Sequence, residues 1–213
     1  MPPRVICPNG PCPRIRITSR RVQFGGSTNA QIHASGAWDI TLGRSNIVIA
    51  ILDDGVQLDH PDLAANIFVN TSEAAGLAGE DDDGNGFIDD LHGWNFFAQD
   101  KNPGPVHAQD NHGTALAGLV ASVGDNGIGI SGAAPRCQVL PLKMITGEDG
   151  IPVTEVSRVL HYAAGLNRQG QSVWRGADII NISLTFGKSF VVDAALRAAA
   201  GGPARDAQLF AIR

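Results

Sequence analysis

The chain has 213 residues, of which 43% are hydrophobic and 17% charged, a composition that predicts a globular protein with one sizeable core. The net charge of −5 does not suggest a nucleic-acid surface, and no segment approaches the roughly 20 apolar residues that cross a bilayer, so we expect neither nucleic acid nor a membrane as a partner. The 26 glycines and the low aromatic content of 6% favour α/β layers joined by tight turns.

Residues 1–24 differ in composition from everything that follows, because they are rich in arginine and proline and contain no acidic residue. We predict that they form a basic, disordered extension before a domain at residues 25–213; the alternative is the end of an upstream region. Met1 is not followed by the apolar segment of a signal peptide. This indicates either a cytoplasmic protein or a start that lies further upstream.

The first strong structural signal is an uninterrupted apolar run at residues 47–52, with a short helix expected before it within residues 29–38. A run without alternation is typical of a central parallel strand that is covered on both faces. Asp53, Asp54 and Gly55 follow directly, at the strand end where open α/β sheets carry their chemistry. The simpler interpretation is a polar turn in which Asp53 or Asp54 acts as an ordinary cap.

Residues 62–108 lack any long helix or strand pattern, and their centre is strongly acidic. Six of the 21 acidic residues fall within residues 80–90, a density that repels itself unless a cation neutralises it. Oxygen-bearing side chains follow the spacing of the first half of an EF-hand loop at Asp81, Asp83, Asn85 and Asp89. His92 stands where that loop has its last ligand, a glutamate. We predict a calcium site; the alternative is a solvated acidic turn.

A second informative stretch begins at Asn111, where small and apolar residues up to residue 123 predict a helix packed closely against a sheet. His112 is expected at the N-terminal end of this helix. The positive end of the helix dipole favours a neutral imidazole there, and a neutral imidazole is the form that a general base requires.

The rest of the chain alternates between strand and helix patterns. The expected elements are a strand at 138–145, a helix at 154–167, a strand at 177–184, a helix at 190–200 and a strand at 208–212. This alternation predicts a parallel sheet with right-handed crossovers.

An aspartate at a strand end and a histidine that opens a later helix are two members of a Ser/His/Asp triad, in the chain order found in subtilisin. Three segments carry a wider resemblance: I-L-D-D-G-V-Q-L-D-H-P-D-L at 51–63, N-H-G-T-A-L-A-G at 111–118 and I-I-N-I-S-L at 179–184. In this order they resemble the successive signatures of the subtilisin-like serine proteases, or subtilases. The resemblance implies a three-layer, doubly wound, mostly parallel α/β sheet and a serine endopeptidase activity.

The resemblance also implies roles for individual residues. Asp53 corresponds to the triad aspartate and His112 to the triad base. Ser183 and Leu184, with the residues around Gly150, resemble the two segments that pair with the backbone of a peptide substrate. We therefore expect polypeptide substrates and a monomeric enzyme. Family members are usually exported, although no signal peptide is evident here.

Calcium is a further implication of the resemblance. Asp62 matches a carboxylate ligand of the family's high-affinity calcium site, and residues 123–129 resemble the loop that completes it, with a side chain from Asp125 or Asn126. Residues 93–100 resemble a loop that carries a weaker calcium site in thermostable subtilases. We expect calcium as a structural cofactor.

The sequence departs from the family pattern in three ways. Ala115 replaces a second histidine, and Thr185 and Phe186 stand where the family usually has glycine. Neither the oxyanion-hole asparagine nor the G-T-S-x-A-x-P segment of the nucleophile occurs before Arg213. We expect the N-terminal part of a catalytic domain, inactive by itself; the alternative is a catalytically dead subtilase-fold module that binds peptide or calcium. A nucleotide-binding domain is disfavoured, since no G-x-G-x-x-G follows a strand.

Overall fold

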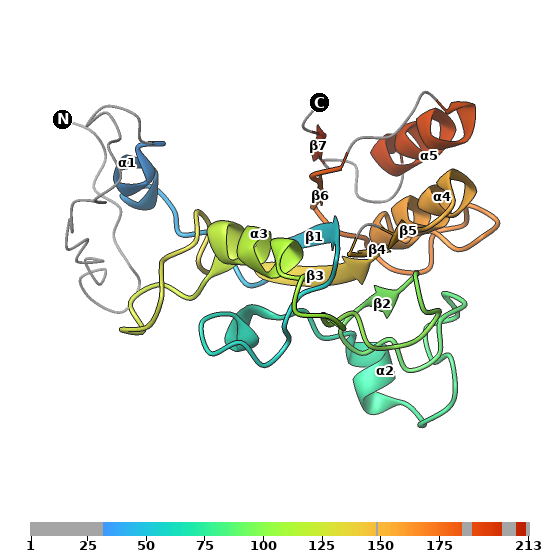
Figure 1. The fold of residues 1–213 in the computed structure, drawn as a ribbon, viewed down its shortest axis with the longest axis horizontal. Helices are drawn as coiled ribbons and strands as arrows, with labels where there is room; N and C mark the ends of the chain where they lie inside the picture. The colour runs from blue at the N-terminus through green and yellow to red at the C-terminus, as the bar shows by residue number, and fades with distance from the viewer. Residues whose placement is uncertain (1–31, 148, 185–188, 202–207, 212–213) are drawn as a thin grey trace.

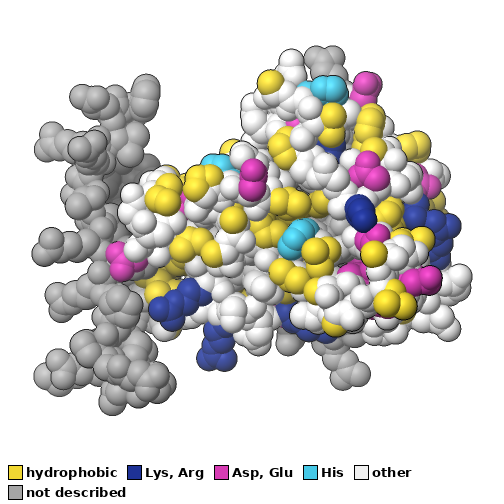
Figure 2. Space-filling view, turned by 90° about the horizontal axis from the view of Figure 1, so that it is seen from below, with side chains coloured by type: hydrophobic (Ala, Val, Ile, Leu, Met, Phe, Trp, Pro, Cys, Tyr) yellow, Lys and Arg dark blue, Asp and Glu magenta, His cyan; other side chains and the backbone are white. Residues whose placement is uncertain are grey.

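The computed structural model describes residues 32–147, 149–184, 189–201 and 208–211 (Figure 1). The predicted extension at residues 1–24 lies outside the described residues. No helix in the described ranges is long and apolar enough to cross a membrane. On the face shown in Figure 2, acidic and basic side chains are interspersed among apolar and uncharged ones.

A five-stranded parallel sheet forms the centre of the fold, with the strand order β2-β3-β1-β6-β7. Its strands are β1 (Val48–Asp53), β2 (Trp94–Asn95), β3 (Gln138–Lys143), β6 (Ile179–Ile182) and β7 (Gln208–Ala211). A separate antiparallel pair, β4 (Ile145–Thr146) and β5 (Asp149–Gly150), follows β3. The mostly parallel α/β sheet predicted from the sequence is confirmed.

Helices cover both faces of this sheet (Figure 1). The helices of the described residues are α1 (Ala34–Trp38), the 3-10 helix η1 (Ala64–Asn66), α2 (Thr71–Ala75), α3 (His112–Ala121), α4 (Val153–Ala163) and α5 (Phe190–Gly201), of which α3, α4 and α5 contribute buried residues to the core. Helix α3 packs on one face through Ala117 and Ala121, whereas α4 and α5 pack side by side on the other face. The fold is therefore a three-layer arrangement of helix, sheet and helix.

Strand β1 explains why its sequence shows no alternation between apolar and polar residues. Val48, Ala50 and Leu52 pack with the helices α4 and α5, while Ile49 and Ile51 pack with α3. All six residues of the strand are buried. A central strand between two helical layers must be apolar on both faces, and only its last residue, Asp53, is charged.

The long segment between β1 and α3 contains more regular structure than its pattern indicates. The elements η1, α2 and β2 all fall within it, but each has five residues or fewer. Such short elements lack a readable periodicity, and side chains stabilise them locally. The amide oxygen of Asn70, for example, accepts a hydrogen bond from the Ser72 backbone N–H and caps α2.

Candidate active site

The end of β1 and the start of α3 bring Asp53 and His112 into direct contact. The Nδ1 atom of His112 lies 2.9 Å from Oδ1 and 3.0 Å from Oδ2 of Asp53. The Asp53 side chain is 1% exposed, whereas that of His112 is 54% exposed. The carboxylate therefore holds the Nδ1 side of the imidazole, while about half of the histidine side chain stays exposed.

The carboxylate of Asp53 is itself fixed by its neighbours. The backbone N–H of Asp54 donates to Oδ1 of Asp53 at 2.8 Å. Burial raises the pKa of Asp53, and the hydrogen bonds from the Asp54 backbone and from His112 oppose this rise. A buried carboxylate that is oriented by two donors can control the tautomer of the imidazole beside it.

Asp54 caps helix α3 from a distant part of the chain. Its carboxylate accepts hydrogen bonds from the backbone N–H groups of His112, at 3.0 Å, and Gly113, at 2.7 Å. The N-cap residue Asn111 makes no capping hydrogen bond with its side chain. Asp54 thus satisfies two free N–H groups and places negative charge at the positive end of the helix dipole. In the sequence, the only indication of this role is that Asp54 stands between Asp53 and Gly55 at the end of the strand.

Two glycines allow α3 to approach β1 this closely. A Cβ atom at Gly113 would lie 2.5 Å from the carbonyl oxygen of Gly55 and 3.0 Å from the Cβ of Asp53. Gly55 has a φ of +108°, in the region that favours glycine, and a Cβ there would lie 2.8 Å from the Pro103 carbonyl oxygen. Larger side chains would push His112 away from Asp53.

A buried ion pair lies beside these residues. Lys143 Nζ donates to Asp110 Oδ2 at 2.8 Å, and both side chains are fully buried. Burial opposes the charge of Asp110, but hydrogen bonds from Lys143, Gly147 and other donors hold the pKa of its carboxyl far below the usual range. Neither residue stood out in the sequence, because the pair joins segments that are distant in the chain.

The residues expected to bind substrate lie in two places. Leu52 of β1 pairs in register with Ile182 of β6, so Ser183 leaves the sheet at the same edge as Asp53. The Asn181 side-chain amide donates to Ser183 Oγ at 3.1 Å, and Leu184 packs partly against the core. Gly150 is exposed on β5, in the antiparallel pair that follows β3. Residues 185 and 186, where the family pattern is broken, lie outside the described residues.

The first candidate calcium region is centred on Asp62, which is 1% exposed. Asn126 donates from its side-chain amide to Oδ1 of Asp62 at 2.8 Å, and the Ile130 backbone N–H donates to Oδ2 at 2.9 Å. A Cβ at Gly129 would meet the same carboxylate. Asp125 is exposed, with a φ of 62°. The structure therefore brings Asp62 together with Asn126 and the loop predicted to complete its site.

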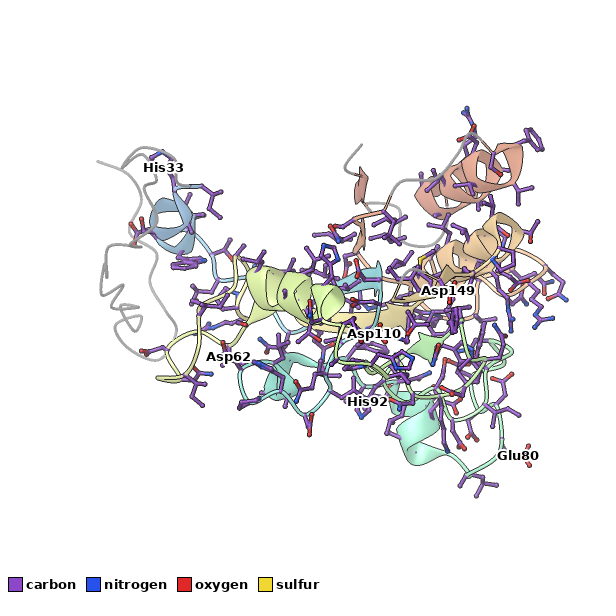
Figure 3. All side chains as sticks on the ribbon, in the orientation of Figure 1. His33, Asp62, Glu80, His92, Asp110 and Asp149 are labelled. Carbon is purple, nitrogen blue, oxygen red and sulfur yellow. The ribbon has the colours of Figure 1, made fainter. Side chains whose placement is uncertain are left out.

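The second candidate region is the acidic loop, which lies well apart from Asp62, as the labels of Asp62 and Glu80 in Figure 3 show. Carboxylate oxygens of Glu73, Asp81 and Asp83 all lie within 4.8 Å of one another. We call these three residues the acidic-loop cluster. Glu73 comes from α2 and was not predicted, because its helix has only five residues and precedes the acidic segment.

Local contacts decide which of the predicted loop residues join this cluster. The backbone N–H of Asn85 donates to Asp81 at 3.1 Å and to Asp83 at 2.9 Å. Asp89 turns elsewhere, since its two carboxylate oxygens accept from Lys101 Nζ, at 2.8 Å, and from the Gly79 backbone N–H, at 3.0 Å. The third carboxylate beside Asp81 and Asp83 is therefore that of Glu73 and not that of Asp89.

A fully buried aspartate links the acidic loop to helix α4. Asp90 accepts a hydrogen bond from the Tyr162 hydroxyl at 2.5 Å, and from the side-chain amides of Asn85, at 2.8 Å, and Asn70, at 2.9 Å. Burial raises the pKa of Asp90 to about 7 although these donors lower it, and the nearby charge of Asp83 adds to the rise.

Comparison with known families gives a match to the Subtilase family over residues 44–211, which includes β1, α3 and all the residues of the candidate active site. The chain belongs to the subtilase family. Among subtilases, Subtilisin-like protease 1 of Plasmodium vivax is 45% identical over 97 residues, which are 46% of this chain and 15% of that protein. Thermitase of Thermoactinomyces vulgaris is 32% identical over 154 residues, which are 72% of this chain and 42% of thermitase.

Solved structures agree with the subtilase assignment. A protease of Pseudoalteromonas arctica superimposes with a TM-score of 0.56 and 26% identity, covering 82% of this chain and 51% of the other. The Aeromonas sobria serine protease shares the fold, with a TM-score of 0.52 and 22% identity over 74% of this chain. This subtilase chain spans less than half the length of the two relatives named above.

Proposed function

We propose that this chain forms the part of a subtilisin-type serine endopeptidase that holds the aspartate and the histidine of the catalytic triad. The observation that carries the proposal is the contact of His112 Nδ1 with both carboxylate oxygens of Asp53, at 2.9 and 3.0 Å. The family match to proteases supports the same reaction class. Asp53 is the orienting residue and His112 the general base.

The proposed proton transfers follow from this geometry. The carboxylate of Asp53 accepts a hydrogen bond from the Nδ1–H group of His112, and this proton stays on the ring. The lone pair on Nε2 is then free to take the proton of a serine hydroxyl. The imidazolium that forms lies against a buried carboxylate that stabilises its charge. Nε2 then returns the proton to the leaving amine, and the cycle repeats with water.

The serine nucleophile and the oxyanion asparagine belong to a later part of the family pattern. No G-T-S-x-A-x-P segment occurs among residues 1–213, and we propose that both groups come from chain outside these residues. A polypeptide of residues 1–213 alone would then form no acyl-enzyme, because the covalent step has no nucleophile.

The proposed substrates are polypeptides bound through their main chain. Ser183 and Leu184 extend beyond the carboxyl end of β6, at the edge of the sheet that also holds Asp53. Gly150 is exposed in the β4–β5 pair, where a peptide backbone has access to it. Pairing with backbone groups at these two segments would bind many sequences.

A fluorophosphonate probe tests the proposed function, because it labels only an activated serine. We expect the full gene product to be labelled and to hydrolyse casein, and residues 1–213 alone to do neither. A full gene product that contains the family's serine segment but shows neither labelling nor hydrolysis would contradict the proposal. It would favour the alternative of a catalytically dead module that binds peptide or calcium.

We also propose that calcium binds at the acidic-loop cluster. The donors are carboxylate oxygens, which this cation prefers, and their spacing within 4.8 Å suits a single ion with Ca–O distances of roughly 2.3–2.6 Å. Glu73 Oε2 is buried and has no hydrogen-bond partner among the described residues. Burial, together with the neighbouring carboxylates, raises the pKa of both Glu73 and Asp83, which means that their ionised forms are disfavoured. A bound cation would remove this penalty by neutralising the carboxylates. Calcium bound here would hold α2 to the loop.

A second proposed calcium ion lies at Asp62 and the side chain of Asn126, with Asp125 as an exposed neighbour. The supporting observation is a buried carboxylate that meets a loop rich in glycine and able to offer backbone carbonyls. Calorimetric titration with calcium after treatment with a chelator tests both ions. We expect binding together with a rise in melting temperature; a chelator that leaves the melting temperature unchanged would contradict both proposals.

A further inference from the structure

Lys143 is an unusual residue to find in the centre of a sheet. It ends β3 in register with Asp53 of β1, and its side chain is fully buried. An ammonium group in such a place must be paired and hydrogen-bonded, or it would lose its charge. Its two acceptors are the carboxylate of Asp110 and the backbone carbonyl oxygen of Asp54.

The two acceptors lie within two residues of the two proposed triad residues in the chain. Asp54 follows Asp53, and Asp110 is two residues before His112. One ammonium group therefore binds both of the segments that must be held together for the imidazole to meet its carboxylate. Asp54 adds a second link, since its carboxylate accepts from the backbone N–H of His112.

Asp110 holds together the loop that leads into α3. Figure 3 labels it near the carboxyl end of the central strands. Its carboxylate accepts from the backbone N–H groups of Val106, at 3.1 Å, and His107, at 3.2 Å, both within this loop. It also accepts from the Thr146 hydroxyl and the Gly147 backbone N–H, each at 2.8 Å, just beyond β3. Rotation of this carboxylate would release the loop from the sheet.

We propose that Lys143 and Asp110 are positioning residues that hold His112 in contact with Asp53. They act through the Asp54 carbonyl group and the loop at 106–111 and touch neither the imidazole nor a substrate. The inference rests on the proposed role of His112 as the base. A pair that served only the stability of the fold would leave the hydrogen bond between His112 and Asp53 unchanged in any variant that still folds.

The test measures that hydrogen bond directly in the full gene product. NMR of protein labelled with ¹⁵N-histidine reports the Nδ1 proton of His112, and the loss of this signal in His112→Gln assigns it. In Lys143→Met and in Asp110→Asn we expect the exchange of this proton with water to accelerate more than about tenfold, because the loop opens more often. We expect kcat for a peptide substrate to fall by about 10²-fold, with KM little changed, because the base is misplaced.

Asp178→Asn is the control, since Asp178 pairs with Arg175 at 3.0 Å and accepts from the Val48 backbone N–H, at the opposite end of β1 from Asp53. It should lower the melting temperature and change neither readout. If Lys143→Met or Asp110→Asn does not fold, Thr146→Val, which removes one neutral donor to Asp110, should accelerate the exchange in the same direction.

Unchanged proton exchange and unchanged kcat in the folded variants would overturn the proposal and leave the pair a structural role only. The NMR readout needs no serine nucleophile. A protein that shows the exchange effect but no hydrolysis would therefore contradict the proposed function and still support the positioning role.

Discussion

Asp54 accepts a hydrogen bond from the backbone N–H of His112 at 3.0 Å, while the preceding residue, Asp53, accepts one from the side chain of the same histidine. Two consecutive carboxylates thus fix both the backbone and the ring of one residue. These two contacts hold the first residue of helix α3 against the carboxyl end of β1. The proposed base depends on Asp54 almost as directly as on Asp53.

The first prediction concerns this second carboxylate. Asp54→Ala removes the acceptor for the N–H groups of His112 and Gly113, and we expect a loss of about 1–3 kcal/mol of unfolding free energy, because buried donors lose their partner. Asp54→Asn keeps one acceptor oxygen and should lose less. Urea unfolding of both variants measures the difference, and equal stabilities of Asp54→Ala and the wild type would contradict the capping role.

The second prediction concerns the close approach of α3 to β1. Gly113→Ala places a Cβ 2.5 Å from the Gly55 carbonyl oxygen, so we expect about 1–3 kcal/mol of destabilisation and a weakened contact between His112 and Asp53. Gly118→Ala is the matched control on the same helix. Its Cβ would meet only the Ser122 hydroxyl, at 3.3 Å. Equal melting temperatures for the two variants would contradict the claim that the close packing of α3 on β1 requires a glycine at position 113.

The two elements that carry Asp53 and His112 could be predicted from the sequence. The uninterrupted apolar run of β1 and the small residues of α3 indicated both elements, with Asp53 and His112 at their ends. Local periodicity carries such information, and the family resemblance added the pairing of the two residues. Their contact in space is now observed.

The remaining features depend on contacts between distant segments. Glu73 joins Asp81 and Asp83 only because the five-residue helix α2 folds back on the acidic loop. Lys143 and Asp110 meet because β3 lies beside β1, and neither residue belongs to a repeating pattern. Periodicity describes which face of an element is buried, but it says nothing of which loop lies above the end of a strand.

The third prediction concerns calcium at the acidic-loop cluster. Glu73→Gln and Asp83→Asn each remove a carboxylate charge from the cluster, and we expect calcium affinity to fall by about 10-fold or more. Asp89→Asn is the control, because Asp89 pairs with Lys101 instead. Calorimetric titration of the three variants tests this set. A larger loss in Asp89→Asn than in Glu73→Gln would reinstate Asp89 as the ligand.

The fourth prediction concerns pH and the buried Asp90. Its pKa is raised to about 7 in the folded protein, so the native state holds a proton that the unfolded chain releases above its ordinary pKa. The stability contributed by this proton is complete below about pH 4 and is lost as the pH rises to 7. We expect the wild type to lose roughly 1–3 kcal/mol more than Asp90→Asn over this range.

The measurement for Asp90 is urea unfolding at several pH values. A chelator is present so that no cation bound near Asp83 changes the electrostatic potential at Asp90. Asparagine at this position keeps an oxygen that can accept from Tyr162 and Asn85, as the Asp90 carboxylate does. Parallel pH profiles for the wild type and Asp90→Asn would contradict the raised pKa.

The central claim, that Asp53 and His112 form the proton-transfer pair of a serine endopeptidase, is tested most directly by the rate at which a fluorophosphonate labels the full gene product. We predict no labelling of His112→Ala and a rate about 10³ to 10⁴-fold below wild type for Asp53→Asn. His107→Ala, which removes an exposed histidine from the loop before α3, should be labelled at the wild-type rate. Labelling of His112→Ala as fast as that of His107→Ala would contradict the account.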